Sequence, residues 1–66
     1  MNIHYDRKAD AMYIELGKGK SDKTREITKS ILIDEDKRGK LLGIEILNVK
    51  DNIDNFDPQN IPLQLF

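Results

Sequence analysis

The sequence predicts a mainly β protein: a small antiparallel sheet of two successive hairpins, then a short helical turn and an extended C-terminal arm. From Ser30 to Val49, two apolar runs rich in β-branched residues flank a polar turn that contains Gly39. This pattern is typical of a β-hairpin. Residues 3–16 repeat it on a smaller scale. Because no stretch shows the spacing of a long amphipathic helix, we expect a β-rich α+β fold.

The length of the chain permits a single domain. A chain of 66 residues buries only about 60 % of the surface that it exposes when unfolded, so a monomer is marginally stable. Small folds therefore depend on disulfides, a structural metal or a partner subunit. The chain has no cysteine and one histidine, His4, which excludes disulfides and Cys- or His-rich metal sites. We expect a homo-oligomer, with a dimer as the simplest case.

Charge and hydropathy limit the possible partners and the compartment. The net charge of −1 gives no electrostatic argument for binding nucleic acid or an acidic membrane. Nine isoleucines and seven leucines supply an aliphatic core. No apolar run has the length of a transmembrane helix, and residues 1–16 show no signal-peptide pattern. We therefore expect a cytoplasmic protein with no membrane partner and no cofactor.

The first hairpin is expected within residues 3–16. Strands at Ile3–Asp6 and Ala11–Leu16 are joined by a turn with Asp6 and Asp10 as turn formers, because aspartate bonds nearby backbone amides. With Tyr5 opposite Met12, period-two alternation gathers one apolar face: Ile3, Tyr5, Met12, Ile14 and Leu16. The segment Thr24–Thr28 is extended, and either strand or irregular structure fits its composition.

The central hairpin admits two registers. A type I turn over residues 36–39 with a bulge at Gly39 places Ile33 opposite Gly43 and scatters the apolar residues. A two-residue turn at Arg38 and Gly39 places Ile33 opposite Ile44. The second register gathers Ile31, Ile33, Leu42, Ile44 and Ile46 on one face. Each buried Ile or Leu contributes about 1.5–3 kcal/mol, so we predict the second register.

The second register leaves three leucines on the opposite face: Leu32, Leu41 and Leu47. That is too many for a solvated surface, so a second subunit or the folded-back C-terminal tail should cover them. In the C-terminal part, residues 50–66, a helical turn or two over residues 50–56 places Ile53 and Phe56 on one side. Residues 61–66 then alternate as an edge strand or an arm to a neighbouring subunit. The interface candidates are Leu32, Leu41, Leu47, Leu63, Leu65 and Phe66.

Two motifs within residues 3–49 resemble a known family. The first is Tyr5-Asp6, Asp10 and Tyr13-Ile14. The second is Ile33-Asp34, Asp36, Gly39 and Gly43-Ile44-Glu45-Ile46-Leu47. Together they resemble domain of unknown function 2283, a family of small prokaryotic proteins.

The resemblance implies a compact β-rich domain of prokaryotic origin and no assigned activity. Some members are encoded beside small toxin-like proteins, which suggests an antitoxin-like role. Where the family usually has an acid before the turn glycine, this chain has Arg38, which argues against a function of an acidic loop.

The acidic residues suggest an alternative, a divalent-metal site or a metal-dependent activity. From Asp34 to Glu45 the acids and Gly39 follow part of the spacing of a calcium-binding EF-hand loop. Arg38 stands where a ligand is needed, and the flanks are strands. A weaker Mg²⁺ or Mn²⁺ site would use Asp6, Asp10, Asp34 and Glu45. These residues also have structural interpretations. The aspartates can form turns, and Glu45 can pair with the cation Arg25 or Lys29 or with the hydroxyl of Tyr13.

Other chemistries have weaker support in the sequence. Lys18, Lys20, Lys23 and Arg25 form a small basic patch that suggests a third function, weak nucleic-acid binding. Without interleaved aromatic residues, a solvated loop explains the patch better. His4 has no cysteine and no obvious serine nearby for nucleophilic catalysis. The sequence therefore favours a non-enzymatic protein-binding module, antitoxin-like and dimeric.

Overall fold

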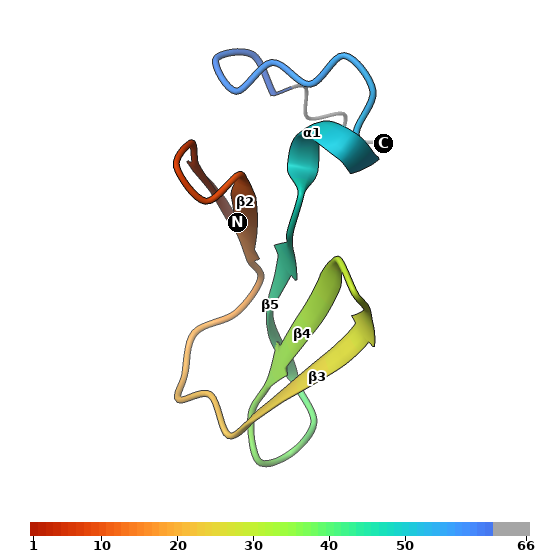
Figure 1. Ribbon diagram of the computed structural model, residues 1–66. Coiled ribbons are helices and arrows are strands. Elements are labelled where there is room, and N and C mark those ends of the chain that lie inside the picture. The colour runs from red at the N-terminus through yellow and green to blue at the C-terminus, as the bar shows by residue number, and fades with distance from the viewer. Residues whose placement is uncertain (62–66) are drawn as a thin grey trace.

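The computed structural model describes residues 1–61 and contains one antiparallel sheet and one short helix (Figure 1). The strands and the helix are β1 (Asn2–Asp6), β2 (Ala11–Glu15), β3 (Lys23–Thr28), β4 (Ile31–Glu35), β5 (Leu41–Ile46) and α1 (Val49–Asn52). The strand order in the sheet is β1-β2-β5-β4-β3. The predicted mainly β fold is confirmed, and β3 adds a regular strand where the sequence left the choice open.

The two predicted hairpins share one sheet because β2 pairs with β5. In the first hairpin Tyr5 lies opposite Met12, as predicted. Met12 in turn lies opposite Ile46, and Ile14 lies opposite Ile44. Paired residues point to the same face of a sheet, so these apolar side chains form a continuous row across three strands.

The turn between β4 and β5 combines both registers considered for it. The amide of Gly39 donates to the carbonyl of Asp36 over 3.0 Å, and Gly39 has a φ of 82°. The predicted two-residue turn at Arg38 and Gly39 is therefore wrong. Ile33 nevertheless lies opposite Ile44, as predicted. An irregularity in the pairing at Asp34 and Glu35 absorbs the extra residue, so the chain keeps both the favourable turn and the apolar pairing.

The same irregularity moves Leu41 to the other side of the sheet. Asp34 pairs with Gly43, and Glu35 pairs with Leu41, so Leu42 has no partner on β4. Leu41 consequently shares the face of Ile33. The prediction that it shares the face of Leu32 and Leu47 is wrong, because period-two alternation fails at a bulge.

The sheet has one apolar face and one polar face. The apolar face carries Ile3, Tyr5, Met12, Ile14, Ile31, Ile33, Ile44 and Ile46. The polar face carries His4, Tyr13, Thr24, Leu32, Asp34 and Glu45.

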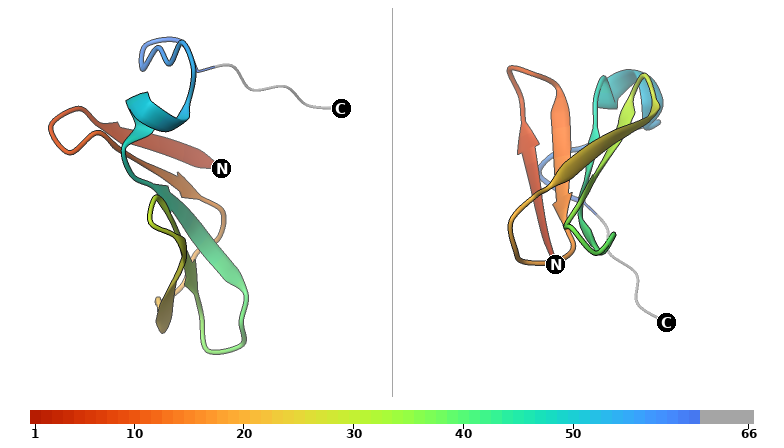
Figure 2. Two further views of the ribbon diagram at one scale, coloured as in Figure 1. Left: turned by 45° about the vertical axis from the view of Figure 1, so that its right-hand side comes forward. Right: turned by 90° about the horizontal axis from the view of Figure 1, so that it is seen from below.

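Helix α1 and residues 53–61 cover one end of the apolar face. Val49 is fully buried, and its amide donates to the carbonyl of Asp10 in the turn between β1 and β2 over 3.1 Å. Phe56 contacts Tyr5 edge to face, with ring centroids 4.8 Å apart. Figure 2 shows this segment at one end of the sheet and the turn between β4 and β5 at the opposite end. The turn is therefore far from the covered part of the core.

The helical segment is shorter than the sequence suggests. Helix α1 ends at Asn52, Ile53 is extended, and Asn55 has a φ of 56°. Ile53 and Phe56 still line one apolar groove, together with Ile61. The predicted arm residues Leu63, Leu65 and Phe66 lie outside the described residues. Within residues 1–61 no helix has the length and hydropathy needed to cross a membrane.

Candidate functional site

Tyr13 and Asp34 meet on the polar face across the central strand β5. Tyr13 pairs with Glu45, but its ring crosses Gly43, and its hydroxyl donates to Oδ2 of Asp34 over 3.1 Å. A methyl group at Gly43 would overlap the hydroxyl and the ring of Tyr13. Gly43 therefore provides the space in which a side chain of β2 reaches β4.

Asp34 also bonds to β3, so one carboxylate connects three strands. Thr24 donates from Oγ1 to Oδ1 of Asp34 over 2.6 Å. Each oxygen of Asp34 thus accepts a side-chain hydrogen bond, one from β2 and one from β3. Because hydrogen bonds to a charged acceptor are stronger than neutral ones, this cluster helps to hold the sheet in register.

The environment of Tyr13 suits a hydrogen-bond donor. Desolvation by burial, and then the hydrogen bond to Asp34, raise the pKa of the Tyr13 phenol above its ordinary value. The phenol is therefore protonated at neutral pH and donates its hydrogen bond to Asp34. Its position between β2 and β4 supports a structural role.

A second tyrosine–aspartate contact ties the first hairpin to α1. The Tyr5 hydroxyl donates to Oδ1 of Asp10 over 2.6 Å, and Oδ2 of Asp10 accepts the Lys50 amide over 3.2 Å. The hydrogen bond to Asp10, followed by burial, raises the pKa of the Tyr5 phenol. Asp10 has a φ of 52°, a conformation that aspartate tolerates better than most residues. Its Oδ2 and its main-chain carbonyl position the start of the helix, and its Oδ1 holds Tyr5.

The four carboxylates proposed for a metal site do not come together. Three of them accept hydrogen bonds from other groups of the fold. Asp6 accepts the amides of Lys8 and Ala9 within its turn. Asp10 and Asp34 bond as described above. Among residues 1–61, no group of three or more acidic, histidine or cysteine side chains is placed to hold a metal ion. The arrangement gives the metal hypothesis no support.

Glu45 lies between Tyr13 and Leu32 on the polar face. Arg25, one of its suggested partners, is paired with Glu35 instead. Tyr13 directs its hydroxyl to Asp34. In the described part of the chain no ion pair includes Glu45. It is half-buried and borders a shallow hollow together with His4 and Asp6 of β1.

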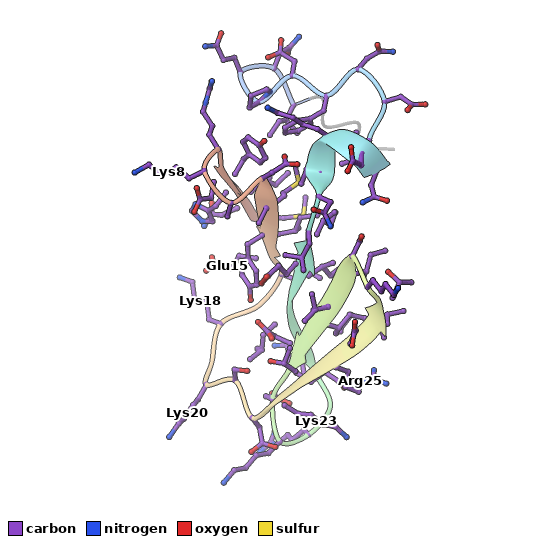
Figure 3. The ribbon with its side chains drawn as sticks, in the orientation of Figure 1. Lys8, Glu15, Lys18, Lys20, Lys23 and Arg25 are labelled. Carbon is purple, nitrogen blue, oxygen red and sulfur yellow. The ribbon has the colours of Figure 1, made fainter. Side chains whose placement is uncertain are left out.

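Basic residues gather at the end of the sheet that α1 does not cover. The loop after β2 lies beside the turn between β4 and β5, where Lys20 borders the same hollow as Lys37 and Arg38. Figure 3 shows Lys18 and Lys20 pointing away from the sheet. Arg25 forms an ion pair with Glu35, so it does not belong to the basic group on these loops. The aromatic contacts described above lie on the sheet, not on these loops, so the patch offers no platform for stacking bases.

The predicted interface leucines are distributed over both faces. Leu41 is 42 % exposed on the apolar side, and Leu32 is half-buried on the polar face. Leu47 is half-buried just beyond β5, where its amide donates to the carbonyl of Ser30 over 2.8 Å. The predicted interface leucines therefore do not form one common surface, because Leu41 and Leu32 lie on opposite faces of the sheet.

Sequence reasoning missed the link between Tyr13 and Asp34. It considered Tyr13 only as a partner for Glu45. The available signal was Gly43, a glycine inside a strand of aliphatic residues. Such a glycine often marks a place where another group approaches the backbone closely.

These features define a class of protein: a small antiparallel sheet held together by two tyrosine–aspartate contacts, with no group of acidic, histidine or cysteine side chains placed to hold a metal ion within residues 1–61. Over residues 2–50 the chain matches the family described as "Protein of unknown function (DUF2283)". The chain belongs to this family, as its motifs suggested. No curated protein and no solved structure matches it.

The matched residues cover all five strands and the start of α1. Most motif residues have identifiable tasks in the fold. They are the donors and acceptors Tyr5, Asp10, Tyr13 and Asp34, the glycine beneath the tyrosine ring, Gly43, and the turn residues Asp36 and Gly39. The motif residues therefore have structural roles in the fold, and we look for a function on the exposed surface of the sheet.

Proposed function

We propose that the chain is a small non-enzymatic protein-binding module that works as a homodimer. The proposed partner is a small protein that the module neutralises or scaffolds, as an antitoxin does. The proposed setting is the cytoplasm of a prokaryote, and the family resemblance suggests the prokaryotic origin. The observation that carries the proposal is an apolar surface that α1 and residues 53–61 leave incompletely covered.

The apolar face is much larger than the segment that covers it. Of its eight side chains only Met12 is buried. Ile31 is 36 % exposed, and beyond the covered end Leu16 and Leu41 are each 42 % exposed. We name Leu16, Ile31, Ile33, Leu41 and Ile44 the apolar patch. Three of these residues are exposed and Ile33 and Ile44 are half-buried. A contiguous aliphatic surface of this kind on a small domain is typical of a protein-binding surface.

The border of the apolar patch is charged. Lys18 and Lys20 in the loop after Leu16, and Lys40 directly before Leu41, are exposed. An apolar centre with a charged rim is the usual arrangement of a protein interface, because the centre supplies affinity and the rim supplies orientation. The arrangement favours a partner with an apolar anchor and acidic residues around it.

The experiment compares binding by the wild-type chain and by two patch variants, Leu16→Asp and Leu41→Asp. A partner captured by the full-length wild-type chain is identified, purified and titrated against each variant. Because both positions are exposed, the fold should survive the change, and circular dichroism checks this. We expect each variant to weaken binding at least about tenfold, since burying an unpaired charge is costly.

The control is Gln59→Asp, which adds the same charge at an exposed position outside both the apolar patch and the basic loops. We expect it to bind like the wild type. Equal affinity of all four proteins for the partner would show that the apolar patch is not the binding surface.

A further inference from the structure

The sheet has two outer strands, β1 and β3, and they differ in how their edges are protected. Strand β3 carries Lys23 and Arg25, and its pairing shifts between Glu26 and Thr28. Charged side chains and bulges of this kind prevent an edge from pairing with another strand. Strand β1 has no lysine and no proline, and all five of its residues pair with β2 in unbroken register. Its outer edge therefore lacks this kind of protection against pairing with a further strand.

Within residues 1–61 no strand occupies the outer edge of β1. An open edge presents a row of backbone amides and carbonyls that a second strand satisfies with main-chain hydrogen bonds. His4, at the centre of the strand, is exposed. The β1 edge is thus a regular and accessible place for another chain.

The sequence of β1 complements itself in one antiparallel register. In a two-fold pair, opposed residues must point to the same face, so their residue numbers add up to an even sum. A register centred on His4 pairs all five residues of the strand. Registers centred on Ile3 or Tyr5 leave part of β1 without a partner from β1.

The register centred on His4 matches the chemistry of both faces. Ile3 lies opposite Tyr5 of the partner subunit, and both belong to the apolar face. Asn2 lies opposite Asp6 of the partner subunit, which pairs an amide donor with a carboxylate. His4 lies opposite itself at the axis. No like-charged side chains of Lys, Arg, Asp or Glu are opposed, which is the first condition for a stable symmetric pair.

We propose that two copies of the chain associate by antiparallel pairing of their β1 strands, with the two-fold axis at His4. The pairing joins two five-stranded sheets into one continuous sheet and places both apolar patches outside the junction. It rests on the homodimer in the proposed function and identifies the surface that forms it. The occupant of the edge is a second copy because the strand complements itself over its whole length.

A single cysteine tests the register directly. The chain has no cysteine, so His4→Cys introduces one thiol per copy. Directly opposed residues in an antiparallel pair have Cβ atoms about 4.5–5.5 Å apart, close to the separation that a disulfide spans. We expect mild oxidation to convert most of the His4→Cys protein into a covalent dimer at micromolar concentration.

The matched control is Glu26→Cys, an exposed central position on the other edge strand. We expect it to remain uncrosslinked under the same oxidation. Equal cross-linking of both variants would indicate random collision and overturn the proposal. Preferential cross-linking through Glu26→Cys would place the contact at β3 and overturn it as well.

A second variant tests the interface without a covalent bond. His4→Lys places two positive charges opposite each other at the axis, whereas His4→Gln keeps a neutral polar side chain. Sedimentation equilibrium should give a dimeric mass for the wild type and for His4→Gln. We expect His4→Lys to raise the dimer dissociation constant at least about tenfold, because like charges directly opposed destabilise a strand pair.

The outcomes separate this proposal from the proposed function. Suppose that the wild type is dimeric, that His4→Lys leaves the dimer dissociation constant unchanged and that His4→Cys does not cross-link. This result would overturn the β1 pairing and leave the homodimer standing. A monomeric wild type at all concentrations would overturn both. Protection of the β1 amides from exchange that does not depend on concentration would show that the edge is filled within one copy, and would also overturn the pairing.

Discussion

At the scale of single residues, Gly43 and Tyr13 act as a unit. The ring of Tyr13 occupies the space above Gly43, and its hydroxyl reaches Asp34 on the next strand. The absence of a side chain at one position thus permits a contact between two strands that are not neighbours. This explains a glycine in the middle of an aliphatic strand, where glycine otherwise weakens the sheet.

Substituting Gly43 by alanine should be costly only while Tyr13 is present. In the wild type, Gly43→Ala forces the ring away from its position, and we expect the free energy of unfolding to fall by about 1–3 kcal/mol or more. In a Tyr13→Ala background the same change meets no ring, and we expect a cost below about 1 kcal/mol. Urea unfolding of the four proteins completes a double-mutant cycle. Additive costs would contradict the coupling.

At the scale of the elements, Asp10 connects the first hairpin to α1. Helix α1 spans only Val49–Asn52, and its N-cap, Asn48, makes no side-chain capping bond. So short a helix is not stable alone. Its first turn depends on the Lys50 amide bonded to Asp10 and on the Val49 amide bonded to the Asp10 carbonyl.

We expect Asp10→Asn to loosen the start of α1 without unfolding the sheet. Asparagine tolerates the positive φ of this position, so the backbone of the turn is kept. The charged acceptor for Tyr5 and Lys50 is lost, and amide exchange at Lys50 should accelerate about tenfold, which corresponds to about 1.4 kcal/mol. Amides in β4 serve as the internal control, and an equal acceleration there would indicate global destabilisation instead.

In the turn between β4 and β5, the sequence predicted the apolar pairing and the turn residues but not the irregularity that connects them. Burial correctly favoured Ile33 opposite Ile44, and turn chemistry correctly favoured Asp36 and Gly39 as turn ends. The two seemed incompatible because a regular ladder satisfies only one of them. An irregular pairing at Asp34 and Glu35 satisfies both. Bulges of this kind have no reliable sequence signal, so the face of Leu41 could not be predicted.

At the scale of the whole molecule, two tyrosine pKa values make stability depend on alkaline pH. The pKa values of Tyr5 and Tyr13 are both raised in the fold. A group whose pKa is raised on folding stabilises the protein fully below its unfolded pKa, about 10 for tyrosine. That contribution is lost as the pH rises through the folded value.

We therefore expect the stability of the wild type to fall between about pH 9 and about pH 12 more steeply than that of the double variant Tyr5→Phe and Tyr13→Phe. The two proteins share every other ionisable group, so the difference between the two curves isolates the tyrosines. Urea unfolding midpoints measured across this range give the comparison. Parallel curves would show that neither phenol is linked to folding.

At the scale of the whole molecule, the incompletely covered apolar face supports the proposal that the protein binds a partner. The described chain buries Met12, Leu42 and Val49, whereas most of its apolar face stays half-exposed. Folded chains of this size are marginally stable as monomers. A β1-paired dimer with the apolar patches outside the junction leaves one surface for self-association and another for a different protein.

The sequence by itself determined the class of fold, the first hairpin register and the apolar pairing of β4 with β5. These depend on alternation and turn chemistry, which are local along the chain. Only the tertiary structure decided that Tyr13 crosses Gly43 to Asp34, that Asp10 holds α1, and that Leu41 joins the apolar face. Each of these depends on strand order or on an irregularity in pairing, which brings together residues that no local pattern relates.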